Sequence, residues 1–231
     1  LDEVIDAINA TGYGLTLGVH SRIDATVRHI VSRAKVGNVY VNRNIIGAVV
    51  GVQPFGGEGK SGTGPKAGGP LYLKRLQKDA PPLVTHARRG NAALDALLGW
   101  ARANGHGDIA ALAENYMETT LDGVRIDLPG PTGERNQLDF VPRGTVLCAP
   151  NGTASLLNQL AAAFATGNRA LVLMEANAAL PAAVKERVRF INTQELDGSD
   201  VALALVEQDV TGDVRAKLAA RPGAIVGIVD T

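Results

Sequence analysis

The stretch from Thr145 to Met174 reads TVLCAPNGTASLLNQLAAAFATGNRALVLM, and it decides the expected fold. It opens with a short apolar run, continues with an amphipathic segment that a Gly-Asn pair ends, and closes with a second apolar run. This order predicts a strand over 145–149, a helix over 155–166 and a strand over 170–174. Because these strands are apolar almost without interruption, the pattern indicates a parallel sheet covered on both faces.

The same alternation continues downstream of this stretch. Short apolar runs predict three further strands, over 188–191, 201–206 and 224–229. Helices are expected between them, over 180–186 and 214–220. Repeated strand–helix–strand units of this kind are typical of the α/β class.

The first 41 residues are also expected to be α/β. Apolar periodicity predicts helix, strand, helix and strand in that order, over 1–8, 15–20, 23–34 and 36–41. Ser21 with Asp24 three residues later resembles a capping box at the start of the second helix. Because the chain begins without Met in a helix and stops in a strand, we expect it to be a piece of a longer protein.

The middle of the chain contains a long irregular segment. Glycine and proline recur so often over 42–70 that regular structure is not expected, and loops of this length are usually functional or disordered. Residues 71–76 resume a strand-like pattern. Residues 78–118 are expected to form a linker and two helices, over 91–103 and 108–116, with N-caps at Asn91 and Asp108.

A hairpin is expected after these two helices. Residues 121–128 alternate apolar and polar side chains, which predicts a half-buried strand. The turn residues Pro129 to Gly133 follow, and residues 138–141 would return as the second strand of the hairpin.

Composition excludes several classes of function. The chain has 231 residues, and its 23 Lys and Arg balance its 23 Asp and Glu, which argues against a dedicated nucleic-acid-binding domain. No apolar run approaches the length of a membrane-spanning helix, and no signal peptide is visible. The single cysteine, Cys148, excludes a disulfide framework and is expected to be a buried core thiol. The four histidines lack metal-ligand spacing, so no metal site is expected.

Two motifs resemble phosphate-binding loops but lack the required context. Gly57 to Gly62 fits G-x-G-x-x-G, but proline precedes and follows it where a strand and a helix are required. A P-loop reading also fails, because Pro54 stands where the first glycine would fall. The loop at 148–152 follows a strand and precedes a helix but contains no glycine-rich fingerprint, which favours a Rossmann-like sheet without a cofactor.

Three motifs carry a specific resemblance: GNVYVNRN over 37–44, QPFGG over 53–57 and SGTGPKAGGP over 61–70. Residues 1–77 resemble the C-terminal end of an aldehyde dehydrogenase catalytic domain. More narrowly, they are similar to the NAD-dependent L-glutamate γ-semialdehyde (1-pyrroline-5-carboxylate) dehydrogenases of bacterial bifunctional proline-utilisation enzymes. The motifs LPGPTGERN over 128–136 and NQLAAA over 158–163 resemble the extra C-terminal domain of the longer members.

The resemblance implies a division into 1–77 of the catalytic domain, 78–118 of linker and helices, and 119–231 of a non-catalytic, degenerate Rossmann-like domain. It implies substrate-binding roles for Gly47 and Ala48, whose N–H groups would anchor the substrate α-carboxylate. Phe55 would pack on the aliphatic stem of the substrate. Small residues suit such an anchor, because consecutive N–H groups can form an anion-binding concavity.

The resemblance also implies what these residues lack. The nucleophilic Cys, the oxyanion-hole Asn and the catalytic Glu of the family lie in motifs upstream of Leu1, so no catalytic or cofactor-binding residue is expected in this chain. The degenerate domain ends its second Rossmann strand with Glu175 instead of the family's ribose-binding Lys. NAD and FAD would belong to the full-length protein, and the fragment alone is expected to be inactive and to bind neither.

The expected partners are glutamate semialdehyde as the substrate and the missing N-terminal part of the same chain. The expected location is the cytoplasm, and peripheral membrane association and oligomer formation stay open. Two alternatives also stay open: a non-catalytic assembly or lid module, and the end of another aldehyde dehydrogenase.

Overall fold

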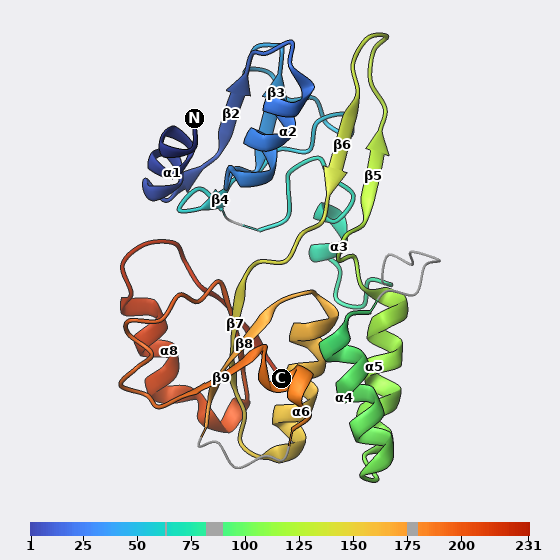
Figure 1. The fold of residues 1–231 in the computed structure, drawn as a ribbon, viewed down its shortest axis with the longest axis vertical. Coiled ribbons are helices and arrows are strands. Elements are labelled where there is room, and N and C mark those ends of the chain that lie inside the picture. Colours follow the sequence, from blue (N-terminus) through green and yellow to red (C-terminus); the bar gives the residue numbers. More distant parts are fainter. Residues whose placement is uncertain (63, 82–89, 175–179) are drawn as a thin grey trace. The chain divides into compact units, whose positions relative to one another are not determined.

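The computed structural model describes residues 1–62, 64–81, 90–174 and 180–231 (Figure 1). These residues form two compact units. Unit 1 contains Leu1–Pro81, Ile126–Leu138 and Pro222–Ile225, and unit 2 contains Pro82–Arg125, Asp139–Arg221 and Val226–Thr231. The predicted α/β class with a parallel sheet is confirmed.

Unit 2 is built on a five-stranded sheet in the order β11-β10-β7-β8-β9, and all its pairings are parallel. Its strands are β7 (Thr145–Ala149), β8 (Arg169–Leu173), β9 (Val188–Ile191), β10 (Leu203–Val206) and β11 (Gly227–Asp230). The chain runs outward from β7 through β8 to β9, and then returns to the other side of β7. This is the Rossmann arrangement, with its topological switch point between β7 and β10.

Helices cover both faces of this sheet. They are α4 (Ala92–Ala103), α5 (Gly107–Thr119), α6 (Thr153–Ala165), α7 (Ala182–Lys185) and α8 (Thr211–Ala220), with a 3-10 turn at Gln208–Val210. Successive side chains of a strand point to opposite faces, so Val146 and Cys148 join one core with α4, α5 and α6. Leu147 and Ala149 join a second core with α8.

The N-cap prediction is confirmed for one of the two helices. The Asn91 side chain accepts hydrogen bonds from the N–H groups of Ala93 and Leu94, at 3.2 and 3.1 Å. The other prediction is wrong, because α5 begins at Gly107 and its N-cap residue is His106. Asp108 lies inside the first turn of α5, where its charge complements the helix dipole.

Unit 1 consists of short elements. They are α1 (Asp2–Ala10), β1 (Tyr13–Gly14), β2 (Thr16–Val19), α2 (Asp24–Arg33), β3 (Asn38–Val41), β4 (Glu58–Gly59) and α3 (Tyr72–Arg75). Strands β2 and β3 pair in parallel, and β1 pairs with β4 in antiparallel orientation. The hairpin strands β5 (Arg125–Leu128) and β6 (Asn136–Asp139) form a further pair, and residues 126–138 belong to unit 1.

Two sequence predictions in unit 1 are wrong. Residues 71–76 contain the short helix α3 instead of a strand, because an isolated apolar run of this length fits either structure. The capping box at Ser21 does not form. The Ser21 hydroxyl accepts from the N–H of Ile23, two residues on, and α2 begins at Asp24 without a side-chain cap.

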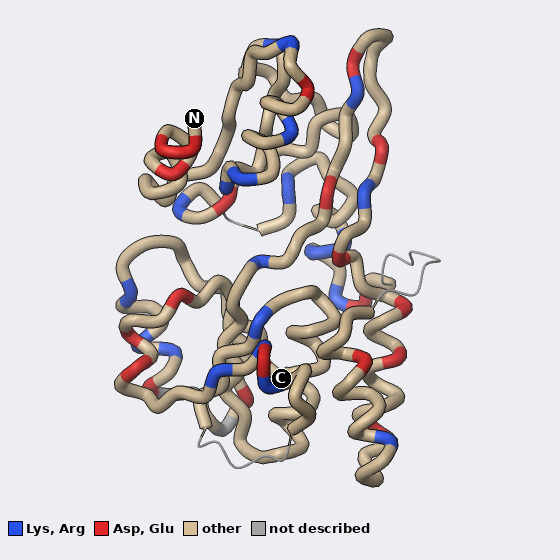
Figure 2. Tube along the Cα trace, in the orientation of Figure 1, with Lys and Arg blue, Asp and Glu red and all other residues tan. Residues whose placement is uncertain are grey.

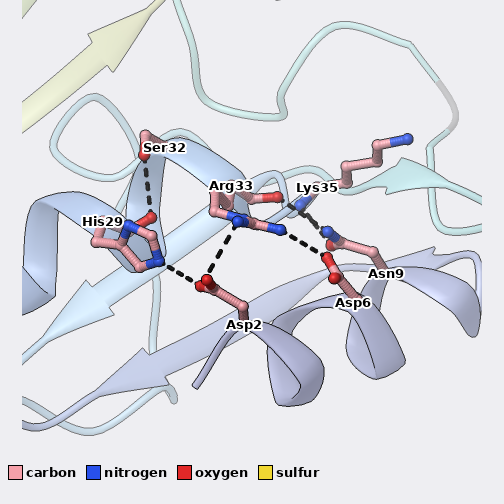
Figure 3. Close-up of polar contacts among 7 residues, drawn as sticks. All are labelled: Asp2, Asp6, Asn9, His29, Ser32, Arg33 and Lys35. Atoms are coloured by element: carbon pink, nitrogen blue, oxygen red, sulfur yellow. Dashed lines mark hydrogen bonds and ion pairs between the residues drawn. The ribbon is translucent and has the colours of Figure 1, made fainter.

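Helices α1 and α2 are joined by a polar network (Figure 3). His29 Nε2 lies 2.5 Å from Asp2 Oδ1, and the Arg33 guanidinium reaches both Asp2 and Asp6, at 3.5 and 3.0 Å. The Asn9 side chain donates to the backbone carbonyl of Arg33 at 2.9 Å. This network fixes the packing of α1 on α2 with side chains that remain in contact with solvent.

We expect the Asp2 carboxylate to make unit 1 sensitive to acid. The hydrogen bond with His29, supported by the charge of Arg33, holds the pKa of Asp2 below its ordinary value. A depressed pKa in the folded state contributes stability above the unfolded value of about 3.9, and this contribution is lost as pH falls through the folded value. Titration of Asp2 by NMR, with urea unfolding at pH 6 and pH 3, measures the effect.

The matched variants for this experiment are Asp2→Asn and Glu3→Gln. Asp2→Asn should unfold more easily than the unmodified protein at pH 6, and the difference should shrink at pH 3. Glu3→Gln, at an exposed neighbouring position, should leave the pH dependence unchanged. A constant difference for Asp2→Asn at both pH values would contradict the assignment.

Candidate functional site

The loop of residues 44–53 lies between β3 and the QPFGG motif and contains Gly47 and Ala48. Gly47 has a φ of +85°, which a residue with a side chain adopts only with strain. The Gln53 side chain closes the loop, because its Oε1 accepts from the N–H of Val49 at 3.1 Å. The N–H of Gln53 donates back to the Val49 carbonyl at 2.8 Å.

Two adjacent N–H groups in this loop are free. Within the described residues, the N–H groups of Gly47 and Ala48 donate to no protein acceptor, and both residues are exposed. A Cβ added at Gly47 would meet no atom within 4 Å, so the space around it is open. Consecutive free N–H groups in a turn form a place where an anion can bind.

Phe55 follows this loop, and its backbone is held on both sides. It exchanges two hydrogen bonds with Ala67, at 3.0 and 2.8 Å. The Asn38 side chain donates to the carbonyl of Pro54 at 2.8 Å and accepts from the N–H of Gly56 at 3.0 Å. The half-buried Phe55 ring is therefore carried by a rigid backbone segment.

Lys66 also holds this segment in place. Its ammonium donates to the backbone carbonyls of Gly37 and Gly56, at 2.5 and 2.6 Å. Burial lowers the pKa of Lys66, and the charge of Glu58 opposes this shift. Asn38 and Lys66 lie within the GNVYVNRN and SGTGPKAGGP motifs, but their hydrogen bonds could not be predicted from the sequence.

The Gly57–Gly62 motif serves close packing of the backbone. It covers β4 and a turn, and the described residues that follow, 64–70, form no helix. A Cβ at Gly57 would lie 2.7 Å from the Ser61 carbonyl oxygen, and one at Gly59 would lie 2.4 Å from the Gly12 carbonyl oxygen. The glycines are therefore explained by sterics without a nucleotide.

Cys148 is a core thiol, as expected. It is completely buried in β7, and burial raises the pKa of its thiol to about 12. Because the reactive species is the thiolate, Cys148 does not act as a nucleophile near neutral pH. Among the described residues, no group of His, Cys, Asp and Glu could hold a metal ion.

The switch point of unit 2 is occupied by polar side chains. Glu207, just after β10, accepts hydrogen bonds from the hydroxyls of Ser155 and Thr231, at 2.8 and 3.3 Å. The buried Gln159 side chain donates to the Thr231 hydroxyl at 2.8 Å. Ser155 lies in the first turn of α6, where a Rossmann fold holds the cofactor pyrophosphate. A carboxylate at this place repels a pyrophosphate, so these residues do not fit a dinucleotide.

The charged residues show no separation by sign along the described chain (Figure 2). Lys and Arg are interspersed with Asp and Glu in both units, and no helix in the described residues is long and apolar enough to cross a membrane. The balanced numbers of Lys and Arg and of Asp and Glu argue against a nucleic-acid partner.

The bifunctional protein PutA of Klebsiella aerogenes is 45% identical over 251 aligned residues, which include 99% of this chain and 19% of that protein. Over almost its whole length, this chain is similar to PutA proteins. It spans about a fifth of the length of the PutA proteins that it matches.

Two other matches cover only part of the chain. The aldehyde dehydrogenase family matches residues 1–78. A 1-pyrroline-5-carboxylate dehydrogenase of a Geobacillus species is 50% identical over 72 residues, which are 31% of this chain and 14% of that enzyme. The solved PutA of Corynebacterium freiburgense covers all of this chain and 22% of its own, with a TM-score of 0.62 and 28% identity.

The likeness to PutA therefore extends beyond residues 1–78 into unit 2. Gly47, Ala48 and Phe55 all lie in the part that matches the aldehyde dehydrogenases. Gly47 and Ala48 are neighbours in one loop, which Gln53 closes, and Phe55 lies two residues after Gln53. Glu175 and one of the four histidines, His86, lie outside the described residues.

Proposed function

We propose that this chain is part of a bifunctional enzyme that oxidises proline to glutamate, and that residues 1–77 bind the substrate of its second reaction. That substrate is L-glutamate γ-semialdehyde, which is in equilibrium with 1-pyrroline-5-carboxylate. The observation that carries the proposal is the pair of free N–H groups at Gly47 and Ala48. They lie within residues 1–78, which match the aldehyde dehydrogenase family. A 72-residue part of the chain is 50% identical to a 1-pyrroline-5-carboxylate dehydrogenase.

These residues would distinguish an amino-acid aldehyde from a simple one. The N–H groups of Gly47 and Ala48 would donate to the substrate α-carboxylate, and hydrogen bonds to a charged group are roughly twice as strong as neutral ones. The Phe55 ring would pack on the three-carbon stem between the carboxylate end and the aldehyde. Holding both parts would fix the aldehyde carbon for attack, which is how positioning lowers a barrier.

The chemistry itself would take place on groups that this chain does not carry. In the full-length protein, bound NAD⁺ supplies the hydride acceptor of the aldehyde oxidation, and FAD supplies the electron acceptor of the proline oxidation. The nucleophilic thiol would also come from elsewhere, because Cys148 is buried and protonated. The contribution of residues 1–77 would be binding and orientation.

We assign a structural role to the Rossmann-like sheet and helices within residues 119–231. Glu207 and its partners fill the switch point of the sheet, so this Rossmann-like domain would bind no dinucleotide. In the division proposed here, residues 78–118 connect it to the catalytic part. We place the full-length enzyme in the cytoplasm.

The test compares the full-length protein with the 231-residue chain. The full-length protein should form NADH from glutamate semialdehyde, and proline should be converted to glutamate without an added second enzyme. The isolated chain should form no NADH and should show no heat of NAD⁺ binding at micromolar concentrations in calorimetry. Loss of the first activity in the full-length protein would favour the alternative, a non-catalytic assembly module. Calorimetric NAD⁺ binding by the isolated chain would overturn the structural role of residues 119–231.

A further inference from the structure

The turn between β5 and β6 presents an acidic side chain to the 44–53 loop. Within this turn the Glu134 N–H donates to the Pro131 carbonyl at 3.1 Å, and Gly133 adopts a φ of +92°. The turn therefore fixes the position of the Glu134 backbone, from which the side chain extends. Residues 126–138 and the 44–53 loop belong to the same unit.

Glu134 uses both carboxylate oxygens. Its Oε1 accepts from the Arg43 guanidinium at 2.9 Å, and its Oε2 accepts from the Gln53 amide at 3.3 Å. The Arg43 and Glu134 side chains are only 28% and 33% exposed, so solvent screens this ion pair less than one on an open surface. Arg43 is itself held in place, because its guanidinium lies 5.5 Å from the ring centroid of the buried Tyr40 on β3.

The Gln53 side chain connects Glu134 with the backbone of the loop. Its amide nitrogen donates to Glu134, while its amide oxygen accepts from the N–H of Val49. Val49 directly follows Ala48, so the amide of one side chain connects the hairpin to the residue beside the two free N–H groups. The partners of Glu134 lie 91 and 81 residues away along the chain, which makes this a tertiary contact.

We propose that Glu134 is a positioning residue for the substrate carboxylate. Held by Arg43, it orients the Gln53 amide, and the Gln53 amide fixes the direction of the N–H groups at Gly47 and Ala48. The hairpin would thereby contribute to substrate recognition without touching the substrate. This inference rests on the proposed function of the 44–53 loop.

The experiment measures Glu134→Ala in the full-length enzyme with two aldehydes. The KM for glutamate semialdehyde should rise roughly 3- to 30-fold while kcat changes less than twofold. The reason is that the N–H groups of the loop lose their orientation, whereas the reacting groups keep theirs. The KM for pentanal, which has no carboxylate, should stay the same. Thr132→Ala in the same turn is the matched control and should change neither constant.

A double variant tests whether the two residues act in series. Gln53→Ala should raise the KM for glutamate semialdehyde as Glu134→Ala does, and the double variant should be no worse than the more affected single variant. Unchanged proline oxidation and pentanal turnover would show that the variants are folded.

Three results would overturn the inference: an unchanged KM for glutamate semialdehyde in Glu134→Ala, an equal rise of the KM for pentanal, or additive effects in the double variant. Failure of the proposed function itself is seen separately, because a loop without a substrate role would leave the KM unchanged when Gly47 is replaced.

Discussion

Replacement of Gly47 by Leu in the full-length enzyme is expected to raise the KM for glutamate semialdehyde by about 10- to 100-fold. Each hydrogen bond to a charged group contributes about 1.5–3 kcal/mol, and the loss of one gives an effect of this size. Leu also disfavours the φ of +85° at this position, so the loop would turn its N–H groups away. Steady-state kinetics with glutamate semialdehyde measure the change.

The matched control for this variant is Gly105→Leu. Gly105 has a φ of +80° and open space around it, as Gly47 does, but it lies between α4 and α5 in unit 2. The Gly105→Leu variant should impose the same backbone strain and leave the KM for glutamate semialdehyde unchanged. Proline oxidation should be unaffected in both variants. An unchanged KM in Gly47→Leu would remove the carboxylate-binding role of the 44–53 loop.

Replacement of Phe164 by Ala is expected to have the largest effect on stability. Phe164 is completely buried on α6, in the core that α6 shares with α4 and α5, and its carbonyl accepts from the Asn91 side chain at 2.7 Å. Truncation of a buried Phe leaves a cavity and costs about 3–5 kcal/mol. Urea unfolding of the 231-residue chain, followed by circular dichroism, should show this loss in the transition of unit 2.

An exposed apolar residue supplies the comparison for Phe164→Ala. Val141 is 69% exposed, and Val141→Ala should change the free energy of unfolding by less than about 0.5 kcal/mol. The urea dependence should keep its slope in both variants. A loss below about 1 kcal/mol for Phe164→Ala would show that the core around α6 tolerates the cavity.

The fold of unit 2 could be predicted well because its local signals agree. The strand predicted at 145–149 coincides with β7, and that at 188–191 coincides with β9, since each is a short apolar run between breakers. Asn91 was identified as an N-cap because its side-chain chemistry acts within three residues. The segment at 71–76 was predicted wrongly because a short apolar run carries no signal that separates a strand from a helical turn.

The site could be predicted only in part. Gly47, Ala48 and Phe55 were identified from a family resemblance, and the free N–H groups became visible only with the hydrogen bonds of the structure. Glu134 could not be connected with Gln53 from the sequence, because 81 residues separate them and the contact depends on how the hairpin folds back. Glu207 was missed for the same reason, since strand order brings it to Ser155.

The return of the hairpin to unit 1 has a consequence for synthesis of the chain. Residues 126–138 leave the ribosome after α4 and α5, although they complete the contacts of residues 1–81. During synthesis of the intervening helices, Arg43 and Gln53 therefore lack their carboxylate partner. Unit 1 therefore cannot be expressed as one contiguous segment of the chain. Its hydrogen bonds with Glu134 can form only after more than half of this chain has been translated.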